Sequence, residues 1–399
     1  MGSGAITTYR PGPLKPFRDA PAIKVEVSFA SNYNAAAPTY VDLTGRIRFT
    51  SGTGITFNRG RNDEWGEIAP GQCTITFNNF DRFLDPSFGG SPYWPNVDWG
   101  RPMKITAYYL GVTYVLFTGL VQNWECSWTA GGDAICTATC VEQLGMLALS
   151  RIAAATILST TVQGRLTDLC TSAGVPAAFQ DFQTGSYQLK AQSYVSQDAL
   201  SACQQVAAGQ NQIFFTSRDG FFRNRAAYTQ FDTSLGTFGE NAGEIHCARM
   251  LAPSIGDPYT YTIVKIHASD AADGSLGAVV TANVPTNLGH PGGGGPTRLG
   301  SNMLERTIAA TPSATLVAGA IATAIATKQG PRIKQATLFP MRDPTNAWPP
   351  VLDADIGNGA TFKYSAPGGG PRFSQPSIVM SVAHTITGEN WVANWNLSP

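Results

Sequence analysis

The residues of this sequence that could hold a metal ion or transfer a proton are few and scattered. It has four histidines, which are His246, His267, His290 and His384. None lies in an H-E-x-x-H pattern, and none is followed by a second histidine or cysteine at the spacing of a metal site. We therefore expect no metal site and no bound cofactor.

The cysteines are odd in number and lie inside apolar patterns. Cys136 and Cys140 are four residues apart, and on an alternating strand both side chains would point to one face. We interpret them as small apolar groups of a core rather than zinc ligands. The set suits a chain made in a reducing cytoplasm; it comprises Cys73, Cys126, Cys136, Cys140, Cys170, Cys203 and Cys247.

Two pairs of close carboxylates could serve hydrolysis of a glycoside, a reaction that needs two such groups beside a sugar. They are Asp81 with Asp85 and Asp353 with Asp355. Residues 78–86 read as a turn-rich segment, in which aspartate side chains bond their own backbone. The sequence also contains no G-x-S-x-G elbow and no phosphate-binding glycine loop. We expect no catalytic residue and no enzyme.

Tryptophans offer a second route to sugar binding. Most of them fall in or beside predicted strands, where burial in a core or an interface is the usual role. Binding of carbohydrate therefore stays an alternative; the tryptophans concerned are Trp94, Trp99, Trp124, Trp128, Trp348, Trp391 and Trp395.

Composition narrows the class of protein further. Among 399 residues, 27 Lys+Arg balance 27 Asp+Glu, and only 14% are charged. Without a basic excess, specific nucleic-acid binding is not expected. The best apolar run, 316–326, is too short to span a membrane, and the first residues lack the apolar region of a secretory signal. Few charges and zero net charge favour association, so we expect partners to cover much of the surface.

Period-two alternation dominates the first part of the chain after a proline-containing arm at residues 1–20. Short strands separated by turns predict a first antiparallel β-barrel domain over residues 21–152. The predicted strands lie at 23–29, 43–49, 54–57, 72–77, 103–109, 112–121 and 134–141.

The remaining chain predicts two further regions. Residues 153–237 read as a small α/β module, with one helix near 162–170, another capped by Ser196, and a hairpin at Asp219-Gly220. Residues 238–399 predict a second β-barrel domain with a loop and helix inserted at about 285–330. The fold class is thus mainly β with an α+β insertion: two small antiparallel β-barrel domains plus a small α/β module.

The two strand-rich regions share a weak internal echo. Asp98-Trp99-Gly100 precedes the strand 103–109, and Asp355-Ile356-Gly357 precedes the strand 360–364. In both regions another apolar strand follows about twenty residues later. Chance similarity and a duplicated unit both remain open.

An ordered series of residues resembles one known family. The series looks like the N-terminal part of minor tail proteins of long non-contractile-tailed bacteriophages, and the later regions resemble the tail-tip or baseplate hub. In the first barrel it comprises Gly60, Arg61, Asn78, Asn79, Asp81, Phe83, Asp85, Pro86, Gly100, Pro102 and Gly119; in the second it comprises Asp355, Gly357, Trp391 and Trp395. Some family members append a hydrolase or fibre, whereas we expect this chain to end with its second barrel.

The resemblance implies structural roles for these residues. Gly60, Arg61, Asn78, Asn79 and Asp81 would be turn and frame residues. For Arg59 and Arg61, a surface ion pair with Glu64 or Glu67 and a contact between subunits both stay open.

The resemblance also implies a homotrimer in the virion, at the tail tip, synthesised in the host cytoplasm. Three subunits with two barrels each would match the six-fold tail tube and distal tail ring on one side and three-fold spike or fibre proteins on the other. The channel would stay closed until genome ejection and then admit the tape-measure protein. The alternatives are a hexameric distal tail ring protein and a carbohydrate-binding or cell-wall-degrading tail protein.

Overall fold

The computed structural model describes residues 15–398 with gaps. The gaps are 17–19, 51, 63, 154, 159, 186–187, 195–196, 228, 230–231, 248, 251–260, 270–275, 285–301, 312, 328–331 and 366–368. Most of the expected arm, the glycine-rich loop near residue 292 and the expected cap Ser196 lie outside the described residues.

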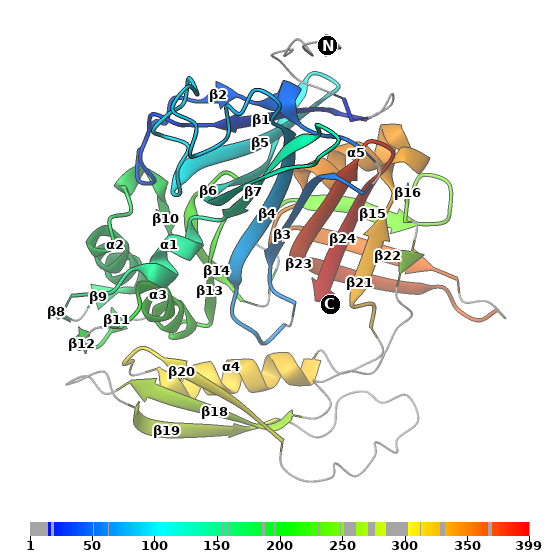
Figure 1. The fold of residues 1–399 in the computed structure, drawn as a ribbon. Helices are drawn as coiled ribbons and strands as arrows, with labels where there is room; N and C mark the ends of the chain where they lie inside the picture. The colour runs from blue at the N-terminus through cyan, green and yellow to red at the C-terminus, as the bar shows by residue number, and fades with distance from the viewer. Residues whose placement is uncertain are drawn as a thin grey trace, which may run out of the picture.

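Fourteen strands form one sheet through the middle of the molecule (Figure 1). Most of its longer strands alternate buried and more exposed side chains, as the period-two pattern predicts. The strands from the first half are β1 (Ala22–Val27), β2 (Val41–Asp42), β3 (Gly54–Gly60), β4 (Ala69–Asn78), β5 (Arg101–Tyr109), β6 (Val112–Trp128) and β7 (Ala134–Val141). Those from the second half are β15 (Ser234–Gly239), β16 (Ile245–His246), β17 (Arg249–Met250), β21 (Gln335–Leu338), β22 (Gly359–Tyr364), β23 (Phe373–Thr387) and β24 (Trp391–Ser398).

The two predicted barrel regions meet where β23 pairs with β3. Residues 381–387 of β23 run antiparallel to residues 54–60 of β3, so both regions share one sheet. The mainly-β class is confirmed. No sheet among the described residues closes on itself, so the structure does not show two separate closed barrels. Two pairings of this sheet, β15 with β22 and β15 with β16, are also parallel where the sequence predicted antiparallel strands.

Each region has its own apolar core. The first core is built around Phe57, Phe77 and Phe117, and it also takes in Trp348 and Trp391 from the far end of the chain. The second contains Phe238, Phe362 and Trp395. Helix α5 (Pro344–Asp353) carries Trp348, and the Tyr109 hydroxyl donates to its first carbonyl, Pro344 O, at 2.9 Å. Side chains from residues 300 positions apart therefore complete the first core.

A helical module lies beside the sheet (Figure 1). Helix α2 begins after Thr161, whose hydroxyl accepts from Gly164 N, and α3 begins after Asp198, whose carboxylate accepts from Ser201 N. The predicted hairpin forms with Asp219-Gly220 in its turn. The elements are α1 (Leu144–Leu149), β8 (Ala155–Ile157), β9 (Thr160–Thr161), α2 (Val162–Ser172), β10 (Gln180–Phe182), β11 (Gln188–Leu189), β12 (Gln192–Tyr194), α3 (Ala199–Ala208), β13 (Gln212–Thr216) and β14 (Phe222–Ala226).

A separate layer contains β18 (Tyr261–Ser269), β19 (Leu276–Asn283) and β20 (Asn302–Ile308), with α4 (Ala314–Thr327) against it. The sequence assigned the first two of these strands to the second barrel, whereas here they form a three-stranded sheet of their own. Short 3-10 turns at Thr44–Arg46, Ala177–Phe179 and Pro340–Arg342 complete the described elements. Division of the chain into domains at residues 20, 152 and 237 stays a prediction.

Candidate functional site

The Asp-x-Gly turn of the internal echo, at residues 98–100 and 355–357, has the same hydrogen bonds in both halves of the sheet. Asp98 Oδ1 accepts a hydrogen bond from Trp99 N at 2.8 Å, and Asp355 Oδ1 accepts one from Ile356 N at 2.8 Å. The glycine that follows has positive φ in both turns, +72° and +91°, a conformation that favours glycine. Its N–H then donates to a valine carbonyl of the long neighbouring strand, over 2.6 Å to Val121 and 2.8 Å to Val379.

Strand order repeats as well. The hydrogen-bonded order β1-β5-β6-β7-β4-β3, which we call the N-terminal unit, matches β15-β22-β23-β24-β21-β17, the C-terminal unit, position by position. The long strands β6 and β23 each carry an irregularity at the same place, after Val121 and after Val379. The outermost pair differs, since β1 is antiparallel to β5 while β15 is parallel to β22. This agreement favours duplication over chance.

A buried ion cluster holds the units and the helical module together. Arg59 of β3 is 3% exposed, and its guanidinium donates at 2.8 Å to Asp355 Oδ1 and at 2.5 Å to Glu142 Oε1. A third bond, of 2.8 Å, goes to the Thr216 carbonyl of β13. The other oxygen of Asp355 accepts from the backbone N–H of Arg218 at 3.0 Å. One arginine therefore joins three parts of the chain.

The charges in this cluster stabilise one another. Burial alone would lower the pKa of the Arg59 guanidinium, but the facing carboxylates of Asp355 and Glu142 outweigh it and raise that pKa. Burial raises the pKa of the Glu142 carboxyl, and Arg59 acts in the opposite direction. Arg59 is thus a permanent buried cation whose charge is balanced by the carboxylates of Asp355 and Glu142.

The expectation of a surface ion pair at Arg59 or Arg61 is wrong. Both side chains are buried, and Arg61 Nη2 donates to the Ala227 carbonyl at 2.8 Å. Glu64 instead faces Arg332, at 2.5 Å. The partners of Arg59 lie 83 and 296 positions away along the chain, beyond the reach of a local sequence pattern.

The residues expected at 78–86 form a tightly bonded turn segment at the end of β4. Asn79 is fully buried, and its Oδ1 accepts from Leu84 N at 3.0 Å. Asp81 accepts from Phe83 N at 3.1 Å and binds the Arg46 guanidinium through both oxygens. Asp85 accepts from Ser87 N at 2.9 Å and from Arg82. All three carboxamide and carboxylate groups bind the protein itself, in positions that hold this turn.

The other singled-out residues are spread over both units. An added Cβ at Gly60 would lie 2.2 Å from the Met380 carbonyl oxygen, and one at Gly119 would lie 2.4 Å from that of Val141. Trp391 and Trp395 are fully buried, in the first and second core respectively. The rest are Asn78 at the end of β4, Phe83 edge-on to Tyr93, the exposed Pro86, and Pro102, whose carbonyl accepts from Ser28 N. These residues do not converge on a common cleft.

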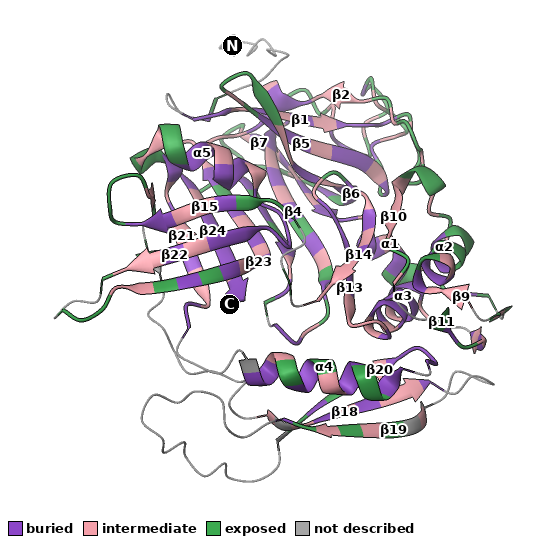
Figure 2. Ribbon diagram, turned by 180° about the vertical axis from the view of Figure 1, so that it is seen from behind, coloured by how far each residue is buried: buried purple, intermediate pink, exposed green. Residues whose placement is uncertain are grey.

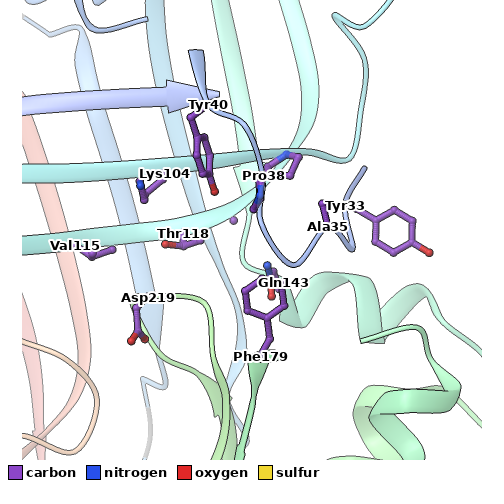
Figure 3. Close-up of a pocket in the computed structure, with 12 residues that line it drawn as sticks. Tyr33, Ala35, Pro38, Tyr40, Lys104, Val115, Thr118, Gln143, Phe179 and Asp219 are labelled. Atoms are coloured by element: carbon purple, nitrogen blue, oxygen red, sulfur yellow. The ribbon is translucent and has the colours of Figure 1, made fainter. Parts of the chain in front are cut away.

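A small pocket opens between the sheet and the helical module (Figure 3). Its volume is about 110 Å³, and Tyr40, Lys104, Thr118, Gln143 and Asp219 supply its polar groups. The Lys104 ammonium lies 4.7 Å from the centre of the Tyr40 ring, and burial, with Glu26 nearby, raises the pKa of Tyr40 to about 12. Neither a histidine nor a cysteine lines it. Within the described part of the chain, no group of three or more His, Cys, Asp or Glu could hold a metal ion.

Figure 2 colours exposed residues green in the sheet, the helical module and the separate layer, and several of these residues are large and apolar. Most tryptophans were expected to be buried in a core or an interface. Trp124, Trp348, Trp391 and Trp395 are buried within the chain. In the N-terminal unit and its loops the exposed set comprises Tyr33, Phe80, Trp94, Trp99, Tyr108, Leu110, Val112 and Trp128. Elsewhere among the described residues it comprises Leu149, Leu158, Val279, Met303, Leu316 and Met341. Among the described helices, none has the length and hydropathy needed to span a bilayer.

Two solved tail proteins have a similar arrangement. The tail protein from Neisseria meningitidis MC58 superimposes with a TM-score of 0.58 over 94% of this chain and 96% of its own, at 10% identity. The 43 kDa tail protein of prophage MuSo2 from Shewanella oneidensis gives 0.55 over 94% and 96%, at 11% identity. The chain has the fold of a phage tail protein.

A similar fold occurs in one further solved complex. A chain of the Francisella PdpA–VgrG complex superimposes with a TM-score of 0.50 and 9% identity, over 94% of this chain and 52% of that one. No protein-family profile matches the sequence, and no curated protein matches it either. Likeness is therefore carried by the backbone arrangement, and the resemblance seen in the sequence holds for the fold.

Proposed function

We propose that this protein is a structural component of a bacteriophage virion, located at the tail tip, where three copies form a hub. The hub joins the six-fold tail tube and distal tail ring to three-fold spike or fibre proteins. It closes the channel until genome ejection and then lets the tape-measure protein pass. The two solved tail proteins that share the fold along nearly their whole length support this assignment.

The repeated unit is the observation that carries the proposal. Each chain presents two units of the same strand order within one sheet, fixed to one another by the β3–β23 pairing and by the Arg59–Asp355 bond. Three such chains offer six similar units, which is what an adaptor between six-fold and three-fold components requires. Three chains with a single unit each would offer only three units.

The surface composition supports the proposal that the protein is part of a larger assembly. The chain carries no net charge, and the N-terminal unit exposes large apolar side chains such as Trp94, Trp99 and Leu110. Aromatic side chains are enriched in protein interfaces, and charged ones are depleted at interface centres. Partners at the tail tip would cover these residues.

The hydrogen bonding of the candidate carboxylates also fits a structural role. The carboxylates at 81 and 85 are bound in turns, and Asp355 is bound in the ion cluster. We therefore propose a role without catalysis, as a building block rather than an enzyme.

Native mass spectrometry of the purified full-length chain tests the proposal. A species of three times the 42.3 kDa chain mass supports the trimeric hub. A stable species of six chains would overturn it in favour of a distal tail ring protein. A monomer at every concentration, together with binding to cell-wall saccharide, would overturn it in favour of the carbohydrate-binding alternative.

A further inference from the structure

Eight strands follow one another by hydrogen bonding across the whole chain. Their order is β6-β7-β4-β3-β23-β24-β21-β17, and every neighbouring pair in this series is antiparallel. The series begins at the end of β6, residues 123–128, and finishes at β17. Neither of these two terminal strand segments has a partner on its outer edge among the described residues.

The direction of the free backbone groups on β6 follows from its neighbour β7. Ala134 O accepts from Asn79 N, so the backbone of Ala134 faces β4. Groups alternate along an antiparallel strand, so Ile135 and every second residue after it face β6. Their partners on β6, which are Ser127, Glu125 and Asn123, therefore face β7. The backbone groups of Trp124, Cys126 and Trp128 face outward.

In the C-terminal unit, the equivalent edge is already occupied. The shared turn and irregularity align Val121 with Val379, and so place Trp124, Cys126 and Trp128 in register with Val382, His384 and Ile386. Those three residues pair with Arg59, Phe57 and Ile55 of β3. The edge that one unit leaves open is the edge that the other unit uses to bind a strand.

At the opposite end of the series, β17 stands where β3 stands in the N-terminal unit. Ile55 of β3 lies opposite Ile75 of β4, and Met250 of β17 lies opposite Ala336 of β21. Ile75 and Ala336 correspond because each pairs with an equivalent residue, Ala138 of β7 and Trp395 of β24. β3 uses its second edge to bind β23, while the second edge of β17 has no described partner.

We propose that β17 of one copy adds to the open edge of β6 in the next copy, repeating between chains the β3–β23 contact made within the chain. The inference rests on the proposed trimer and names its contact. The two surfaces differ, so the contact is head to tail and closes when copies form a ring. Strand addition satisfies the open backbone groups, which otherwise invite aggregation.

Register within the chain predicts two specific pairs of residues across this contact. Ile55 lies opposite Ile386 and Gly54 opposite Thr387, so Met250 would lie opposite Trp128 and Arg249 opposite Thr129. The second pair occupies the position where neighbouring backbones exchange no hydrogen bonds. Such residues have Cα atoms about 4.5 Å apart, which is within the range of a disulfide.

Mixing two full-length variants, Thr129→Cys and Arg249→Cys, tests the pairing under mild oxidation with oxidised glutathione. In the mixture we expect a disulfide-linked dimer of one chain of each kind. Its yield should be at least about tenfold above that of any disulfide-linked dimer in either variant alone, because cysteines with Cα atoms beyond about 7 Å cannot bridge. The single variants control for the native cysteines, including Cys247 close to β17. No heterodimer above that background would overturn the inference.

A backbone test on the same edge needs no cysteine. Trp128→Pro removes both the tryptophan side chain and an outward backbone N–H. Trp128→Ala removes the same side chain but keeps the backbone N–H. We expect the proline variant to lose the trimer and the alanine variant to retain it. Trimers with both variants and no crosslink would overturn the strand pairing while leaving the hub proposal standing, whereas absence of any trimer in the unmodified protein would overturn both.

Discussion

Arg59 Nη1 donates to Asp355 Oδ1 over 2.8 Å, although 296 positions separate the two residues in the chain. Asp355 opens the repeated turn of the C-terminal unit, and Arg59 lies on the strand of the N-terminal unit that pairs with β23. The bond therefore fixes the relative placement of the two units that the proposed hub depends on.

Removing the Asp355 carboxylate should destabilise the fold. In Asp355→Ala, the Arg59 cation stays buried with only Glu142 facing it, and we expect a loss of about 3 kcal/mol in the free energy of unfolding. Asp353→Ala is the matched control, since that carboxylate binds Arg218 but is 42% exposed, and should cost less than about 1 kcal/mol. Urea unfolding monitored by tryptophan fluorescence measures both; equal losses would contradict the role given to the cluster.

Close approach of β3 to β23 predicts a steep cost at Gly60. Its φ is +101°, and an added Cβ would lie 2.2 Å from the Met380 carbonyl oxygen. Gly52 has a φ of +82° and nothing within 4 Å, so Gly52→Ala reports the backbone cost alone, about 1–2 kcal/mol. We expect Gly60→Ala to cost about 1–3 kcal/mol more, as overpacking does. Thermal unfolding of both variants checks this. Similar melting temperatures would contradict the close packing of β3 against β23 at Gly60.

Stability should fall in mild acid because of His384. This side chain is buried, its Nδ1 accepts from Trp391 Nε1 at 2.8 Å, and its ring stacks on Phe57. Burial, with Arg59 nearby, lowers the pKa of His384 to about 3. The unfolded chain binds a proton below its ordinary pKa of about 6.5, so the stabilising contribution is complete above that pH and declines below it, by about 1.4 kcal/mol per pH unit.

The variant His384→Gln separates this effect from that of the carboxylates. Glutamine can accept from the Trp391 indole but does not titrate, so the decline in unfolding free energy between pH 6.5 and 5 should become shallower. Denaturant unfolding at several pH values measures the slope. An unchanged slope in the variant would mean that His384 is not the group responsible.

Two exposed tryptophans distinguish an interface from a sugar site. Trp94 and Trp99 are 54% and 59% exposed, so replacing either with alanine should leave monomer stability within about 0.5 kcal/mol. For a structural hub we expect no change in binding to cell-wall saccharide, measured by calorimetry. A saccharide affinity that is present in the unmodified protein and lost in either variant would favour the carbohydrate-binding alternative.

Sequence alone predicted most of the strands but not their association. Alternation marks β1, β4, β7 and β24 because one face of each is buried, and the Asp-x-Gly echo at residues 98 and 355 identified the repeated turn. The sharing of one sheet by both units escaped prediction, since β3 and β23 pair across more than 300 residues. Helix α5 escaped too, because Pro349 and Pro350 usually end a helix.

Charged residues were the hardest to interpret from sequence. Glu64 and Glu67 stand close to Arg59 and Arg61 in the chain, so a surface ion pair was one expectation and a contact between subunits the other. Tertiary structure buries both arginines, and Arg59 takes its carboxylates from distant segments.

Electron cryomicroscopy of the purified assembly measures its symmetry directly. We predict three copies around a central channel, with the N-terminal and C-terminal units alternating so that six units surround the axis. Six copies presenting the same unit to the channel, or a single isolated chain, would contradict it.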